Sequence, residues 1–219
     1  SFGKIFHPGK PSGGKSSFGG KDPSAEDDMP WSWSEAPYHP PAQKDKNSPT
    51  CGPSLPSQKH GQLYSNMFCP VDPAKEPKGA LPDMQTTAEV LRVLSDRREG
   101  IDPPAFLAVG YHKPHIPFKF PAQYLDLVPT EAEMSLADDP EVSPWMRAPP
   151  GSVALDTWTD VRSRQDVTAL NIPFPYGRMP DNFARMMRRG YLAAIAYTDD
   201  QIGQVLGGLQ EAGMEDNTI

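Results

Sequence analysis

The stretch AFLAVGYHKPHIPF, residues 105–118, joins a strand pattern to a cationic loop. Its first part, Ala105 to Tyr111, is an apolar run of strand length, which predicts a strand buried on both faces in the middle of a sheet. The following His-Lys-Pro-His segment places two imidazoles and an ammonium at the strand's carboxyl end, where open α/β sheets bind their ligands. His115, which lies between two prolines, is therefore a candidate anion-binding residue. The alternative is a strand cap whose imidazoles only satisfy backbone groups.

The composition is that of a chain with a core but with unusually many prolines. Its 219 residues suffice for one domain of ordinary size, and the 27 prolines predict long irregular connections. The formal net charge of −7 argues against general binding of nucleic acid or anionic membranes, so an anionic substrate needs a local cationic cluster. No apolar run is long enough to span a bilayer, and no signal peptide is visible.

Helical periodicity appears on both sides of this strand. Residues 83–99 carry an apolar stripe and are followed by Gly100 as a stop. The side chains that could cap the start of this helix are Asp83, Thr86 and Thr87. Pro121 predicts a short helix over residues 122–127.

A long helix is predicted from Asp181 to about Ala212, ending at Gly213. Its continuous apolar stripe predicts that it lies on a sheet face. The basic residues expected on its solvent side are Arg185, Arg188 and Arg189. The glycines expected to mark close packing, where a side chain would not fit, are Gly203, Gly207 and Gly208.

Residues 10–80 and 128–180 are predicted to be loop-rich. In the first segment an aromatic patch should hold the loop against the protein, and it comprises Trp31, Trp33 and Tyr38. In the second, an acidic cluster suits either bound calcium or a solvated loop, with the loop favoured; it comprises Asp138, Asp139 and Glu141.

Cys51 and Cys69 are the only cysteines, and they bracket a loop. This pattern suits a disulfide in an oxidising compartment, and a catalytic cysteine is the alternative. Lys4 and His7 lie close together beside a Pro-Gly turn. They could bind an anion and transfer a proton, although an exposed lysine and a turn histidine are the plainer interpretation.

Three segments in order along the chain resemble the sulfatase family: GKIFHPG at residues 3–9, FLAVGYHKPHIPF at residues 106–118, and the helix and turn of residues 191–219. The resemblance implies an α/β fold, the alkaline-phosphatase-like α/β/α sandwich with a mixed sheet. It also implies that residues 1–219 are the middle part of one sulfatase catalytic domain, with the sandwich incomplete.

The same resemblance implies a role for each cation. Lys4 would bind a sulfate oxygen and His7 would assist at the formylglycine nucleophile. His115 would hydrogen-bond the sulfate and protonate the leaving sugar oxygen, which suits the charge that develops during sulfate transfer. Lys113 would face the carboxylate of the substrate, and His112 would be structural.

The family's nucleophile and metal are expected elsewhere. Cys51 begins the string Cys-Gly-Pro-Ser-Leu, which ends in leucine where the family's C-x-P-S-R motif has arginine. Cys51 also comes after the GK segment, whereas the family's nucleophile comes before it. We therefore expect Cys51 to pair with Cys69. The formylglycine modification and the ligands of the calcium ion that the family implies would both lie outside residues 1–219.

The resemblance implies a hydrolase of the lysosome that acts on a sulfated glycosaminoglycan, at the 2-sulfate of iduronate in dermatan and heparan sulfate. This chain alone would be inactive. Two alternatives stay open: a related sulfatase or phosphoesterase of the same superfamily, and a non-catalytic, proline-rich interaction segment. The sequence does not indicate the oligomeric state.

Overall fold

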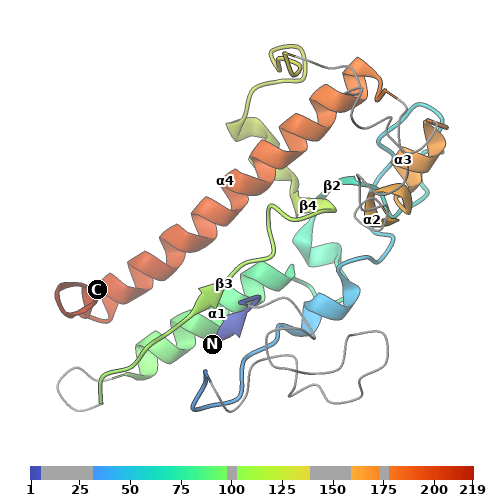
Figure 1. The fold of residues 1–219 in the computed structure, drawn as a ribbon. Coiled ribbons are helices and arrows are strands. Elements are labelled where there is room, and N and C mark those ends of the chain that lie inside the picture. The colour runs from blue at the N-terminus through green and yellow to red at the C-terminus, as the bar shows by residue number, and fades with distance from the viewer. Residues whose placement is uncertain (6–31, 98–102, 139–158, 173–177) are drawn as a thin grey trace, which may run out of the picture. The chain divides into compact units, whose positions relative to one another are not determined.

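The structure, a computed structural model, describes residues 1–5, 32–97, 103–138, 159–172 and 178–219 (Figure 1). The chain divides into two compact units. The first comprises Ser1–Lys44, Ala80–His112 and Thr198–Ile219, and the second comprises Asp45–Gly79 and Lys113–Tyr197. The assignment of all 219 residues to one catalytic domain stays a prediction.

The first unit is built on a parallel pair of short strands, β1 (Phe2–Gly3) and β3 (Val109–Gly110), beside helix α1 (Pro82–Asp96) (Figure 1). Its core comprises Phe2, Val90 and Leu94, with partly buried residues from the last turns of α4 (Asp181–Glu211) packed against it. Short 3₁₀ helices lie at Pro41–Asp45 (η2), which crosses into the second unit, and at Glu215–Asn217 (η7). The unit is therefore a small α/β layer, in agreement with the expected α/β class.

The predicted buried strand over residues 105–111 is wrong for most of its length. Strand β3 has two half-buried residues, while Phe106, which stacks on Trp33, is 81% exposed. Among the described residues β3 pairs only with β1, so one of its edges carries no ladder. A parallel strand is buried only when both edges and both faces are covered, and apolar composition alone does not provide that cover.

Helix α1 begins at Pro82 and not at one of the predicted caps. Proline suits the first helical position because it has no N–H to leave unsatisfied, and Leu81 precedes it without a side-chain cap. The three residues predicted as caps are buried inside the helix: Asp83, Thr86 and Thr87. The apolar stripe is confirmed at Val90 and Leu94, which are buried, while Gly100 lies outside the described residues.

The second unit is built on a longer parallel pair, β2 (Phe68–Val71) and β4 (Phe118–Pro121), in the register Cys69↔Lys119 (Figure 1). The predicted short helix is a 3₁₀ helix, η4 (Ala122–Leu127). The buried rings of Phe68 and Phe120 meet edge to face in its core, with 6.2 Å between centroids. At its surface Phe118 contacts the exposed ring of Tyr191 edge to face, at 5.8 Å.

The two segments predicted as loops contain regular structure. Residues 10–80 include β2 and a 3₁₀ helix, η3 (Pro73–Lys75), and residues 128–180 include α2 (Thr159–Arg162) and α3 (Gln165–Ala169). These elements are too short to show a full hydrophobic period, so pattern reading misses them. Of the predicted aromatic patch, Trp33 stacks on Phe106 with ring centroids 6.4 Å apart, and Tyr38 packs against the core of the first unit. Trp31 lies outside the described residues.

The long helix is confirmed as α4, and Gly213 follows it with a φ of +70°. Its start packs on the β2–β4 sheet, where a Cβ on Gly190 would lie 2.8 Å from the Phe68 ring. The prediction of tight packing holds at Gly208, whose added Cβ would lie 2.2 Å from Leu91. It is wrong at Gly203 and Gly207, which face open space. The stripe is also less buried than predicted, with residues exposed at Tyr191, Ile195 and Ile202.

The basic run of α4 does not all face solvent, which corrects the prediction for two of its three members. Arg185 donates from Nε to the Met134 carbonyl at 2.9 Å, and Arg189 donates to the Leu125 carbonyl at 3.1 Å. Both are half-buried, while Arg188 is exposed. Guanidinium groups carry several donors, so they can satisfy backbone carbonyls at the end of a 3₁₀ helix and in the turn that follows it.

None of the described helices is long and apolar enough to cross a membrane.

Candidate active site

Lys4 lies at the carboxyl end of the β1–β3 pair. Its N–H donates to the Gly110 carbonyl at 2.9 Å, and Gly3, just before it, has a φ of +72°. An added Cβ on Gly3 would lie 2.1 Å from the Gly110 oxygen, and one on Gly110 would lie 2.0 Å from the Lys4 oxygen. Glycine is therefore required at both positions, since any side chain would push the strands apart. His7 lies outside the described residues.

The strands are parallel, so Lys4 and the residues after Gly110 leave the sheet at the same edge. His112 therefore lies just past the carboxyl end of the strand, as predicted. The convergence of Lys4, His7 and His115 on one anion stays a prediction.

Tyr111 and His112 anchor this edge to α1. The Tyr111 hydroxyl lies 2.9 Å from the Thr87 hydroxyl, and burial raises the pKa of Tyr111. The His112 N–H donates to the Asp83 carboxylate at 2.8 Å, and Asp83 is 2% exposed. This contact is made by the backbone of His112, whose imidazole Nδ1 lies 3.7 Å from the same carboxylate. The structural role expected for the imidazole stays a prediction.

His115 is exposed on the loop that leads into β4, and its Nδ1 lies 2.6 Å from the Ile116 carbonyl oxygen. A carbonyl can only accept, so Nδ1 carries the hydrogen and Nε2 is the nitrogen that gains or loses a proton. Nε2 is also the nitrogen that a histidine acting as general acid would use here. This arrangement is compatible with the predicted donation to a leaving oxygen.

Lys113 lies on the same loop, with its ammonium directed at the loop's own backbone. Its Nζ donates to the His115 carbonyl at 2.8 Å and to the Pro117 carbonyl at 2.6 Å. The predicted role toward a substrate carboxylate is not tested by these contacts.

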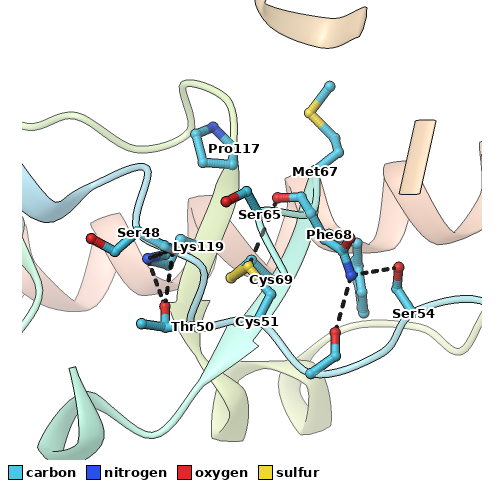
Figure 2. Close-up of a disulfide and its surroundings, with 12 residues drawn as sticks. Ser48, Thr50, Cys51, Ser54, Ser65, Met67, Phe68, Cys69, Pro117 and Lys119 are labelled. Carbon is cyan, nitrogen blue, oxygen red and sulfur yellow. Dashed lines mark hydrogen bonds between the residues drawn. A yellow bond between two sulfur atoms is a disulfide. The ribbon is translucent and has the colours of Figure 1, made fainter. Parts of the chain in front are cut away.

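Cys51 and Cys69 form a disulfide, with an S–S distance of 2.05 Å (Figure 2). Cys69 lies on β2, and Cys51 pairs with Tyr64 in an isolated antiparallel bridge. A cysteine in a disulfide has no thiol to act as a nucleophile, so the prediction of a bridge is confirmed over that of a catalytic cysteine.

Sequence reasoning missed a buried ion pair beside this disulfide. Lys119, opposite Cys69 in the β2–β4 register, lies 3.2 Å from the Glu76 carboxylate, and their side chains are 3% and 5% exposed. Lys119 also donates to the Thr50 hydroxyl at 2.8 Å and to the Ser48 carbonyl at 3.2 Å, in the segment that leads to Cys51 (Figure 2). Burial lowers the pKa of Lys119, and the charge of Glu76 opposes that shift. A lysine flanked by two phenylalanines was the only signal in the sequence.

Asp166 is a second buried charge that sequence reasoning missed. It is 0% exposed, and its carboxylate accepts hydrogen bonds from the backbone N–H groups of Met67 at 2.7 Å and Phe68 at 3.1 Å. The Ser54 hydroxyl approaches it at 3.4 Å. Asp166 thereby satisfies the backbone where β2 begins and ties α3 to the sheet.

The described residues do not supply the calcium site that the family resemblance implies. No group of three or more His, Cys, Asp or Glu among them could hold a metal ion. Of the acidic cluster, Asp138 is exposed, and Asp139 and Glu141 lie outside the described ranges.

Comparison with known proteins identifies the family of this chain. A family model for Sulfatase matches residues 24–219. The chain is 44% identical over 219 residues to the iduronate 2-sulfatase of Mus musculus and 43% identical over 220 residues to that of Homo sapiens. Each alignment covers 100% of this chain and 36% of the relative, so the chain spans about a third of their length. The matched family model and the identity along the whole chain place this protein in the Sulfatase family, whose members are hydrolases of sulfate esters.

Proposed function

We propose that this chain is part of an enzyme that removes the 2-sulfate of iduronate in dermatan and heparan sulfate. The observation that carries the proposal is the 44% identity to an iduronate 2-sulfatase along all 219 residues. The loop of residues 112–115 supports the proposal, because the exposed His115 imidazole, with Nδ1 bound to a carbonyl, is suited to donate a proton from Nε2. The α/β/α sandwich and the single catalytic domain belong to the same proposal.

In this proposal Lys4 and His115 act on different atoms of the ester. The Lys4 ammonium binds nonbridging sulfate oxygens and stabilises the negative charge that they carry in the transition state. The His115 imidazolium donates its Nε2 proton to the sugar oxygen as the S–O bond breaks, so that the sugar leaves as a neutral alcohol. His7 is proposed to assist the nucleophile that attacks the sulfur.

The proposed location is the lysosome. Imidazole groups in general titrate near ~6.5, so a mildly acidic compartment favours the imidazolium form that can donate a proton. The sulfated glycosaminoglycan would be held by the local cations, since the formal charge of −7 opposes general attraction of a polyanion.

The test is turnover of a 2-sulfated iduronide by the full gene product that contains this chain. His115→Ala should lower kcat by about 100-fold or more, in line with the loss of a general acid. His60→Ala, which changes an exposed histidine between the two cysteines, is the matched control and should leave kcat unchanged.

Near-normal turnover in His115→Ala would remove His115 from the mechanism. A wild-type protein that cleaves phosphate esters but no sulfate ester would instead favour the phosphoesterase alternative.

A further inference from the structure

We propose that Lys113 is a positioning residue that holds the His115 imidazole in its reactive orientation, and that it does not bind the substrate carboxylate. This inference rests on the proposed function for what His115 does. It departs from the role that the family resemblance suggested for Lys113.

The first observation is the pattern of hydrogen bonds on three consecutive carbonyls. The Lys113 ammonium donates to the carbonyls of His115 at 2.8 Å and Pro117 at 2.6 Å. The carbonyl between them, on Ile116, accepts from His115 Nδ1 at 2.6 Å. Lys113 thus fixes the peptide groups on both sides of the one that orients the imidazole.

The second observation is that this loop is short of backbone donors. Pro114 and Pro117 have no N–H, so two of the five residues from Lys113 to Pro117 cannot form the hydrogen bonds that usually stabilise a turn. An ammonium with three N–H groups supplies donors from a side chain instead, and charge-assisted hydrogen bonds are stronger than neutral ones. Lys113 therefore replaces turn hydrogen bonds that the prolines remove.

The chemical consequence concerns orientation. With the Ile116 carbonyl held in place, His115 keeps its hydrogen on Nδ1 and leaves Nε2 as the nitrogen that exchanges a proton. Without Lys113 the His115 carbonyl loses its charged donor, whereas the Pro117 carbonyl still accepts from the Lys119 N–H at 2.8 Å. The loop can then rotate the Ile116 carbonyl away from the ring. A displacement of about 1 Å at a reacting group can lower a rate by about 100-fold.

The experiment measures kcat and KM separately in the full gene product. Lys113→Met should lower kcat on a 2-sulfated iduronide by about 10- to 100-fold and leave KM within about twofold. It should also leave unchanged the inhibition constant of the desulfated iduronide, which keeps its carboxylate. Lys113→Arg should restore part of kcat, because guanidinium can reach the same carbonyls. Lys78→Met, at an exposed lysine of the same unit, is the matched control.

A rise in KM and in the inhibition constant, with kcat unchanged, would assign Lys113 to the substrate carboxylate and overturn the proposal. A crystal structure of Lys113→Met gives a readout that does not depend on activity: the contact between His115 Nδ1 and the Ile116 carbonyl should be lost. If that contact persists, the proposal is wrong even where the wild type is an active sulfatase. If the wild type cleaves no sulfate ester, the proposed function fails, and this contact still decides the positioning role.

Discussion

Replacing Lys119 by methionine should lower the free energy of unfolding by about 3–5 kcal/mol, because the substitution leaves the Glu76 carboxylate buried without its cation. At the observed separation of 3.2 Å, two unit charges interact by about 5 kcal/mol at an effective dielectric constant of ~20. In the intact protein the cost of burying both charges offsets much of this attraction. In the variant the cost of burying Glu76 remains and the attraction is gone. The hydrogen bonds that Lys119 donates to the Ser48 carbonyl and the Thr50 hydroxyl are lost as well.

The assay is urea unfolding of the purified protein, followed by circular dichroism, with Lys75→Met as the control. Lys75 also pairs with an acid, at 3.3 Å from Asp72, but its side chain is 83% exposed. The control should therefore change the free energy of unfolding by less than about 0.5 kcal/mol. Adding Glu76→Leu to Lys119→Met should recover part of the loss, because no unpaired charge is then buried. A loss below about 1 kcal/mol in Lys119→Met, or a double variant that loses the sum of both single effects, would refute this reasoning.

The same pair predicts a dependence on pH. Burial lowers the pKa of Lys119 from its ordinary value of 10.5, so in the interval between the two values the unfolded chain binds more protons than the folded chain. Stability contributed by this group therefore rises as the pH rises through that interval. The difference in unfolding free energy between wild type and Lys119→Met should grow with pH there, and a constant difference would show that burial does not perturb Lys119.

Two further predictions concern packing and the cross-link. Reducing the Cys51–Cys69 bridge, or replacing both cysteines by serine, should lower the free energy of unfolding by about 3 kcal/mol, because the bridge closes a loop with a sequence separation of 18. Urea unfolding curves that superimpose with and without reductant would contradict this. Gly190→Ala should lower the unfolding free energy by about 1–3 kcal/mol through its clash with the buried Phe68 ring. Gly203→Ala, on the same helix but facing open space, should raise it by roughly 1 kcal/mol, and equal effects of the two substitutions would show that the close approach at Gly190 is unimportant.

The chain's local patterns were sufficient to locate its two long helices and its cross-link. Apolar spacing predicted α1 and α4 to within a few residues of their bounds, because every helical hydrogen bond joins residues close in sequence. The disulfide followed from there being only two cysteines, and the cationic loop at the end of a strand was visible as a change of residue type.

Only the tertiary structure decided which side chains are buried and what each cation contacts. The apolar run before Val109 is largely exposed because β3 is paired along one edge in the described residues. Lys119 and Glu76 are 43 residues apart, and Lys113 turns its ammonium back onto its own loop. Burial and ion pairing depend on which distant segments meet, and a sequence pattern records only the neighbours along the chain.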